Sequence, residues 1–305
     1  MNTTSHRVIL TGSNGFTGQK VAKLLAANPD VTLMGLSRGP DRSAIKDKFT
    51  YQEADLLDFP HLRQIFDDFR PTEVIHTAAM TQVNECETQQ DLCWKVNVEL
   101  VDYLAQQCKR HHARFLHLST DFVFDGNDGP YKETDATNPL SFYGKSKLAS
   151  EQLLKQAGIP YAILRTVLLY GYAPHTSRSN FVRWVKDSLE KQTPIRVVQD
   201  QYRTPTWVED FALGIVSCLL KNQTGIYHLS GGEMMSISDL AYRVAAEWQL
   251  DDSLISAVTS AELNELAPRP KKTGFVIEKA QHKLGYQPHS LEQGLAKTII
   301  QINGN

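Results

Sequence analysis

Short runs of apolar and β-branched residues alternate with amphipathic segments along the first half of the chain. Such runs are typical of buried strands, and they occur at 7–11, 31–36, 73–77, 113–118 and 160–165. Between them, apolar residues recur at helical spacing within 18–27, 59–69, 94–109 and 143–157. Repeated strand–helix–strand units favour a parallel sheet with helices on both faces. We therefore predict an α/β fold with a doubly wound parallel sheet.

The pattern changes after about residue 170. Longer polar loops and short strands there join helices predicted near 178–191, 207–221, 236–249 and 290–302. A length of 305 residues predicts either two domains or one large α/β unit with an appended lobe. We expect a sheet domain over 1–170 and a smaller, mostly helical lobe over 171–305, with segments of the lobe returning to the sheet.

Composition limits the classes of partner. Lys and Arg number 32 against 34 Asp and Glu, which gives a net charge of -2, and there is no run of basic residues. We therefore expect neither a nucleic-acid partner nor membrane association. The residues before the first strand lack the apolar core of a signal peptide, and the four cysteines form no CxxC motif. Reduced thiols and a cytoplasmic location are the expectation.

Three glycines separate the first predicted strand from the first predicted helix, in the pattern Gly12-x-x-Gly15-x-x-Gly18. A dinucleotide pyrophosphate needs backbone free of Cβ atoms and a helix N-terminus that supplies N–H donors. A loop directly after the opening strand of such a sheet meets both needs. The sequence thus predicts a dinucleotide cofactor on these glycines and on Asn14 and Phe16, within a Rossmann domain.

The end of the second predicted strand bears on the choice of cofactor. A site for NAD usually places Asp or Glu there, to hold the ribose hydroxyls. No carboxylate occurs between Val31 and Pro40, and the strand ends with Ser37 and Arg38. An Arg side chain can pair with a 2′-phosphate, and a Ser hydroxyl can donate to it. We therefore predict NADPH as cofactor, with NADH as the alternative.

Tyr143 and Lys147 lie four residues apart at the start of a predicted helix, so they share one helical face. A nearby ammonium group is expected to lower the pKa of a phenol from its usual value near 10. Such a Tyr can exchange a proton with a carbinol oxygen at neutral pH. The strand before this helix ends in Ser119-Thr120-Asp121, which supplies hydroxyl groups at the same edge of the sheet. Lys147 can also reach the ribose of a nicotinamide cofactor.

The glycine pattern and the Tyr143-x-x-x-Lys147 pair together resemble the extended short-chain dehydrogenase/reductases. The resemblance covers most of the chain. It is narrowed to the dTDP-4-dehydrorhamnose reductases by four segments, 119–126, 139–148, 200–206 and Arg269-Pro270. The chain also resembles the regulatory β-subunits of methionine adenosyltransferase, which have much the same motifs.

The resemblance implies a reaction in which NADPH delivers hydride to the C4 ketone of a dTDP-4-keto-6-deoxyhexose. It implies three catalytic residues: Thr120 orients the ketone, Tyr143 is the general acid, and Lys147 tunes Tyr143 and holds the ribose. It also implies further cofactor-binding positions. Asp55 and Leu56 would flank the adenine, Ala78 and Ala79 would line the cofactor channel, and Asn97 would help to position the active-site loop.

On the substrate side, the predicted contacts are Thr81, Asp121, Phe122, Arg203 and Arg269. The two arginines lie in polar loops of the C-terminal lobe and suit bidentate binding of phosphate, with an exposed surface charge as the alternative. Sugar-nucleotide dehydratases of this superfamily carry an acidic residue at the position of Phe122. Phe122 cannot transfer a proton, so dehydration is not expected.

Two departures from the family pattern are informative. Rhamnose-pathway reductases commonly place a Trp, which packs on the sugar, where this chain has Leu168. Some members dimerise through Mg²⁺ held by an acidic residue just past the third glycine, where this chain has Gln19 and Lys20. We therefore predict no bound metal and leave a homodimer open. Two alternative functions also stay open, an NAD(P)-dependent nucleotide-sugar epimerase and a non-catalytic NADP-binding regulatory subunit.

Overall fold

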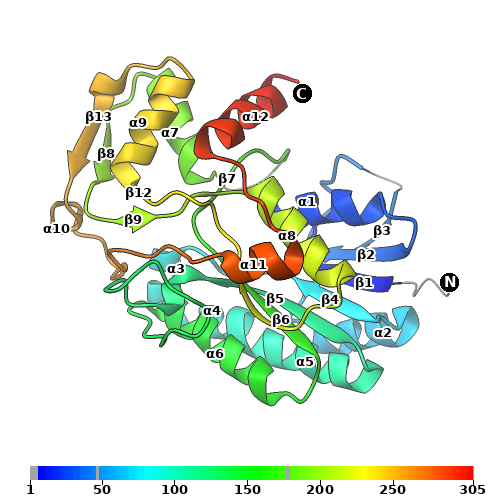
Figure 1. The fold of residues 1–305 in the computed structure, drawn as a ribbon. Coiled ribbons are helices and arrows are strands. Elements are labelled where there is room, and N and C mark those ends of the chain that lie inside the picture. The colour runs from blue at the N-terminus through cyan, green and yellow to red at the C-terminus, as the bar shows by residue number, and fades with distance from the viewer. Residues whose placement is uncertain (1–5, 46–47, 176–178, 305) are drawn as a thin grey trace.

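The computed structural model describes residues 6–45, 48–175 and 179–304. Its centre is a seven-stranded parallel sheet in the order β11-β6-β5-β4-β1-β2-β3 (Figure 1). The strands span β1 His6–Thr11, β2 Val31–Ser37, β3 Thr50–Glu53, β4 Glu73–His76, β5 Arg114–Thr120, β6 Tyr161–Thr166 and β11 Gly225–His228. The order reverses direction between β1 and β4, which is the arrangement of a doubly wound sheet. The predicted fold class is confirmed.

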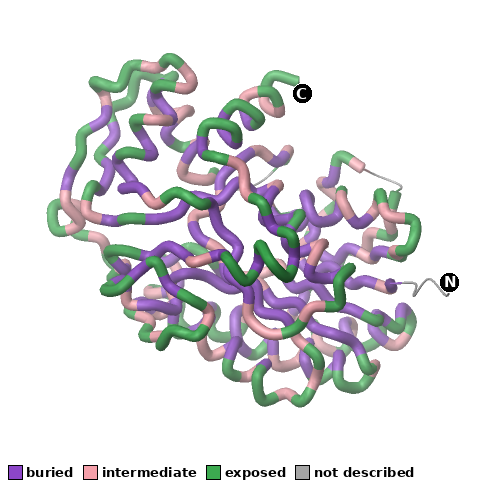
Figure 2. The backbone as a smooth tube through the Cα atoms, viewed as in Figure 1, coloured by how far each residue is buried: buried purple, intermediate pink, exposed green. Residues whose placement is uncertain are grey.

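Helices cover both faces of the sheet (Figure 1). One face carries α2 (Phe59–Phe69), α5 (Leu100–His111) and α6 (Phe142–Gln156), and the other carries α1 (Phe16–Ala26), α8 (Val208–Leu220) and α11 (Glu278–Leu284). Because side chains alternate along a strand, β1 contributes residues to the hydrophobic core on each face of the sheet. Val8 and Leu10 pack on the side of α1, and Ile9 packs on the side of α2. The sheet is the most deeply buried layer of the molecule (Figure 2).

The C-terminal lobe has a separate core between α7 (Phe181–Glu190), α9 (Ile237–Glu247), α12 (Leu291–Asn303) and a parallel strand pair. The pair is β8 (Ile195–Val198) and β13 (Ile255–Val258). Two smaller pairs join β7 (Leu169–Tyr170) to β10 (Thr206–Trp207), and β9 (Tyr202–Arg203) to β12 (Met235–Ser236). The helices predicted in this half are present, although residue 178 and the N-terminal residues 1–5 lie outside the described residues.

Two segments of the second half return to the first. Strand β11 pairs in parallel with β6 and closes one edge of the sheet, and α8 packs against α1. The core on this face therefore draws on both halves of the chain. The division at residue 170 stays a prediction. In the described part of the chain, no helix has the length and apolarity needed to cross a membrane.

Some elements differ from the sequence-based expectation. The long helix predicted over 94–109 is broken into α4 (Gln90–Trp94), a π-helical turn (Lys95–Glu99) and α5. Strand β3 was not predicted, because its four residues are half-buried or exposed and carry no apolar run. The short helices α3 (Val83–Thr88) and α10 (Ser260–Leu263), α11, and the 3₁₀ turns at 121–123 and 252–254 were not predicted either.

Candidate active site

The glycine loop is built by close backbone approach. Gly12 adopts a φ of +75°, and a Cβ atom on it would lie 2.7 Å from Thr77 Oγ1 and 2.8 Å from Ala78 N. A Cβ atom on Gly18 would lie 2.1 Å from Gly12 O, so only glycine allows α1 to approach the loop this closely. Gly15 caps α1 without a side-chain hydrogen bond. Among the described residues, the first-turn N–H groups of α1 therefore have no capping side-chain acceptor, as an anion site requires.

Asn14 fastens the loop that follows β2. Its Nδ2 donates to Arg38 O at 3.3 Å and to Pro40 O at 3.0 Å, and its Oδ1 accepts from Arg42 N at 2.9 Å. Its own backbone N–H donates to Ser37 Oγ at 3.0 Å. The Asn14 side chain is thus engaged within the protein, which favours a positioning role over a cofactor contact.

Arg38 is the exposed cation of this loop. Its side chain is solvent-exposed, and within the described ranges no hydrogen bond or ion pair is recorded for its guanidinium group. Phe16, at the start of α1, is partly exposed as well. Both side chains can therefore contact a bound ligand without first breaking an internal interaction.

The ends of β3 and β4 bring the remaining predicted cofactor positions beside the glycine loop. Ala78 and Ala79 are half-buried and follow β4, whose end is tied to β1 by a 2.7 Å bond from Thr77 Oγ1 to Thr11 O. Asp55 is exposed and Leu56 is buried after β3. Parallel strands deliver their carboxyl ends to one edge of the sheet, so these residues share the edge with Gly12.

Asn97 lies in the π-helical turn and is 1% exposed. Its Nδ2 donates to Met80 O and to Ser146 Oγ, each at 3.0 Å, and its Oδ1 accepts from Met80 N at 2.9 Å. The side chain therefore joins the loop after β4 to α6, next to Tyr143. This geometry fits the expected positioning of the active-site loop. It does not favour direct contact with a cofactor.

Thr120 and Tyr143 meet at the edge of the sheet. Thr120 ends β5, and Tyr143 lies in the first turn of α6, which Ser141 caps through a 3.2 Å bond from Gly144 N. Burial raises the pKa of Tyr143 well above its usual value, and a hydrogen bond with Thr120 opposes this rise. The expected lowering of that pKa by Lys147 is wrong for this structure. The main cause of the rise is desolvation of the phenolate in a buried site.

Lys147 is buried beneath the same face of α6, at 3% exposure. Its Nζ lies 3.1 Å from His117 Nε2. Burial lowers the pKa of Lys147 to about 8, and the charge of Glu151 opposes this fall. His117 was not among the predicted site residues. The available signal was the polar alternation of His117 and Ser119 in an otherwise apolar strand.

Arg203 is buried, at 4% exposure, so the alternative of an exposed surface charge is wrong for this residue. A phosphate contact through Arg203 stays a prediction. Its Nε lies 3.5 Å from Asp121 Oδ2, its Nη1 donates to Tyr202 O at 2.7 Å, and its Nη2 donates to Pro270 O at 2.8 Å. All three nitrogens form interactions inside the protein, so Arg203 joins β9 of the lobe to the residue that follows β5.

Asp121 is the anionic partner of Arg203 in this ion pair. It is 3% exposed, and its Oδ1 accepts from Thr120 Oγ1 at 3.0 Å. Its Oδ2 also accepts from Thr273 Oγ1, a residue that the sequence did not single out. Burial raises the pKa of Asp121, and Arg203 and Thr273 oppose that rise. Asp121 therefore links Thr120 to the lobe and is already engaged on both oxygens.

The other predicted substrate residues lie nearer to solvent. The Phe122 ring is partly exposed and meets the Tyr143 ring edge-on, with centroids 5.7 Å apart. Thr81 is exposed. Arg269 is partly exposed and forms an ion pair with Glu265 at 2.8 Å. Leu168 has a positive φ of 37° and packs between the sheet core and the lobe core. Phe122, Thr81 and Arg269 keep access to a ligand.

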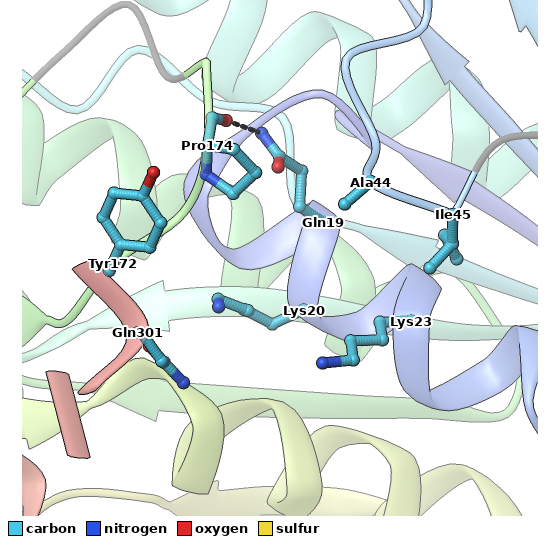
Figure 3. A pocket seen from close by; sticks show the side chains of 8 residues that line it. All are labelled: Gln19, Lys20, Lys23, Ala44, Ile45, Tyr172, Pro174 and Gln301. Carbon is cyan, nitrogen blue, oxygen red and sulfur yellow. Dashed lines mark hydrogen bonds between the residues drawn. The ribbon is translucent and has the colours of Figure 1, made fainter. Parts of the chain in front are cut away.

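A cavity of about 140 Å³ lies beside α1 (Figure 3). Its walls include Gln19 and Lys20, the two residues that follow Gly18. Gln19 Nε2 donates to Pro174 O at 3.0 Å, and Lys20 Nζ pairs with Glu209 Oε1 at 2.7 Å. In the described part of the chain, no group of three His, Cys, Asp or Glu side chains could hold a metal ion.

Comparisons with known proteins agree with this geometry. The sequence model of the RmlD substrate binding domain matches residues 6–303. A dTDP-4-dehydrorhamnose reductase of Aggregatibacter actinomycetemcomitans is 33% identical over 301 residues, which cover 95% of this chain and 97% of the relative. Methionine adenosyltransferase 2 subunit beta of Bos taurus is 29% identical over 266 residues, 86% of this chain and 78% of that protein.

Solved structures give the same result. The dTDP-4-dehydrorhamnose reductase of Bacillus anthracis in complex with NADP superposes with a TM-score of 0.84 at 28% identity. The match covers 97% of this chain and 99% of that one. The UDP-glucuronic acid 4-epimerase of Bacillus cereus in complex with UDP-glucuronic acid and NAD superposes with a TM-score of 0.84 at 25% identity, covering 97% and 99%. The chain therefore belongs to the RmlD substrate binding domain family, within the NAD(P)-dependent oxidoreductases of the extended short-chain dehydrogenase/reductase type.

Proposed function

We propose that this protein reduces the C4 ketone of a dTDP-4-keto-6-deoxyhexose with NADPH. The observation that carries the proposal is the hydrogen bond between Thr120, which ends β5, and Tyr143, which shares one face of α6 with Lys147. Similarity to named dTDP-4-dehydrorhamnose reductases supports the substrate class. Leu168 replaces the Trp expected from the family pattern, so the surface that packs on the sugar differs from that of those reductases.

Tyr143 is suited to donate a proton to the ketone oxygen. A phenol is protonated at neutral pH at its ordinary pKa near 10, which is the form that a general acid needs. Burial raises the pKa of Tyr143 further and so makes it a weaker acid, and a cation that stabilises the phenolate would offset this. The Thr120 hydroxyl, within hydrogen-bonding reach of Tyr143, would orient the ketone. Proton donation leaves a phenolate. Lys147, on the same face of α6, would stabilise that charge through its ammonium group.

The residues around the glycine loop fit a nicotinamide dinucleotide. Gly12 and Gly18 form a cradle that a Cβ atom would fill, and α1 offers uncapped N–H groups to the pyrophosphate. Arg38 and Ser37 would hold the 2′-phosphate, and Asp55 and Leu56 would flank the adenine. Ala78 and Ala79 would line the cofactor channel. The cofactor supplies the hydride for the reduction. Residues of this chain position it and supply the proton.

A second candidate is a regulatory subunit that binds NADP without catalysis. Its specific support is the 29% identity to methionine adenosyltransferase 2 subunit beta over 86% of this chain. The epimerase alternative is supported by the 25% identity to UDP-glucuronic acid 4-epimerase. An epimerase regenerates its cofactor, so its reaction would show no net loss of NADPH.

The test is the loss of NADPH absorbance on addition of dTDP-4-dehydrorhamnose, with NADH in parallel. We expect rapid oxidation of NADPH by the natural chain. The Tyr143→Phe variant should lose roughly 10²–10⁴-fold in turnover, because a general acid contributes that much. It should still bind NADPH. Full turnover in Tyr143→Phe would contradict the assigned chemistry. Silence of the natural chain with NADPH bound would favour the regulatory subunit or another sugar.

A further inference from the structure

Two side chains of β3 hold the loop that follows β2. Tyr51 Oη donates to Gly39 O, and Glu53 Oε1 accepts from Gly39 N at 3.0 Å. The backbone donor and the backbone acceptor of Gly39 are thus both satisfied from the neighbouring strand. Gly39 directly follows Arg38, the residue that we expect to hold the 2′-phosphate of NADPH. Strand β3 therefore bears on the shape of the cofactor site.

The pairing of β3 with β2 explains why both side chains reach this loop. The two strands run in parallel, with Gly35 opposite Tyr51 and Ser37 opposite Glu53 (Figure 1). Side chains two positions apart in a strand point to the same face of the sheet. Tyr51 and Glu53 therefore share one face, beside the end of β2 from which the loop starts.

The hydrogen bonds of the Tyr51 phenol have a defined direction. Its oxygen carries one proton, and Gly39 O is the nearer of its two carbonyl acceptors, since Ser37 O lies 3.1 Å away. The phenol keeps this proton at neutral pH, because its ordinary pKa is near 10 and burial raises it. Tyr51 Oη also accepts from Asn14 Nδ2 at 3.0 Å. The second amide proton of Asn14 is left for the loop carbonyls, Pro40 O among them at 3.0 Å.

The backbone on either side of Arg38 is thus fixed, whereas its side chain is exposed. A loop that is ordered before binding loses less conformational entropy when its side chain meets a ligand. NADPH carries a 2′-phosphate and NADH does not. An ordered backbone at Arg38 therefore favours the binding of NADPH and gives nothing to NADH.

Tyr51 separates the shape of the loop from its charge. Glu53 is exposed and places a carboxylate on the same loop, so its replacement would change both the hydrogen bond to Gly39 N and the local charge. The Tyr51 hydroxyl is neutral. Its removal changes the support of the loop and leaves the charges around a bound phosphate as they are.

We propose that Tyr51 is a positioning residue for cofactor choice, whose hydroxyl holds Gly39 O and thereby keeps Arg38 in place for the 2′-phosphate of NADPH. This inference rests on the proposed contact between Arg38 and that phosphate. It assigns a role in cofactor specificity to β3, a strand that the sequence analysis did not predict.

The experiment compares the dissociation constants for NADPH and NADH by calorimetric titration of the natural chain and of Tyr51→Phe. The variant keeps the ring and loses the hydroxyl. Affinity for NADPH should fall roughly 3- to 10-fold, the effect of losing one hydrogen bond between neutral groups. Affinity for NADH should stay unchanged. The ratio of the two constants is the readout, because a general loss of stability would weaken the binding of both cofactors alike.

Tyr242→Phe is the matched control. Tyr242 Oη also donates to a backbone carbonyl, Ile255 O at 3.3 Å, but it does so within the C-terminal lobe. Both dissociation constants should therefore stay as they are in the natural chain. An unchanged ratio in Tyr51→Phe would overturn the proposal, and so would an equal loss of affinity for NADPH and NADH.

A double-mutant cycle with Arg38→Ala tests the route of the effect. Tyr51 acts through Arg38, so Tyr51→Phe should change the affinity for NADPH much less once Arg38 is already Ala. Additive losses in the double variant would also overturn the proposal.

Binding needs no turnover, so this test is separable from the proposed reaction. A chain that reduces no sugar, but whose ratio shifts in Tyr51→Phe, would reject the reaction and keep the role of Tyr51. A natural chain that binds NADPH no more tightly than NADH would reject the contact between Arg38 and the 2′-phosphate, and the role of Tyr51 with it.

Discussion

The buried ion pair between Arg203 and Asp121 gives a sharp test of how the lobe is attached to the active site. The two side chains are 4% and 3% exposed, and they join β9 of the lobe to the end of β5. Arg203→Met keeps the apolar length of the side chain and removes the charge. It leaves Asp121 buried without its cation, which costs about 3–5 kcal/mol of unfolding free energy in comparable sites.

The assay is urea unfolding followed by fluorescence and by circular dichroism, in a double-mutant cycle with Asp121→Asn. Each single variant should be strongly destabilised, and the double variant should lose much less than the sum, because neither charge is then left alone. Arg196→Met is the control. Arg196 is exposed, with a 3.2 Å bond from Nη2 to Glu262 O, and its loss should change stability by about 0.5 kcal/mol or less.

The penalty should also depend on pH in a defined direction. Burial raises the pKa of Asp121 and Arg203 opposes this, so loss of Arg203 raises that pKa further. A carboxyl group whose folded-state pKa lies above its unfolded value of about 3.9 binds more protons when folded, so stability falls as pH rises above that value. Arg203→Met should thus be least destabilised near about pH 5 and most destabilised above neutrality. Additive effects in the cycle, or a penalty below about 1 kcal/mol, would refute the buried-pair reasoning.

Three further predictions concern the cofactor side. Gly18→Ala should weaken NADPH binding at least roughly 10-fold, because loss of the close approach to Gly12 O misplaces the N–H donors to the phosphates. Gly232→Ala is the control and should have no effect, since nothing lies within 4 Å of a Cβ atom there. Calorimetric titration of both variants with NADPH tests this. Arg38→Ala should raise the KM for NADPH roughly 10-fold, the effect of losing a charge-assisted hydrogen bond to phosphate, and should leave the KM for NADH unchanged. Equal changes in KM for both cofactors would reject the 2′-phosphate contact. Asn97→Leu should lower the free energy of unfolding by about 1–3 kcal/mol for each buried backbone group of Met80 left unpaired, as measured by urea unfolding. An unchanged free energy of unfolding would contradict the positioning role of Asn97.

Local patterns were enough for the class of fold and for part of the site. Strand and helix periods are encoded within a few residues, so the alternation up to residue 165 predicted the sheet and the helices that cover it. The glycine loop was predictable for the same reason, since the close approach of Gly18 to Gly12 O is made within one short segment of the sequence. The shared face of Tyr143 and Lys147 followed from helical spacing alone.

Tertiary structure decided what those side chains touch. Arg203 appears in the sequence as a loop cation, and only the approach of residues 270 and 121 buries it. The Lys147 ammonium group faces His117, a partner that lies 30 positions away. The predicted lowering of the Tyr143 pKa was wrong because desolvation depends on the packing around the phenol, which spacing does not report. Spacing along the chain thus determined which groups share a strand or a helix. Their burial and pairing depend on contacts distant in sequence, which exist only once the sheet and the lobe have packed together.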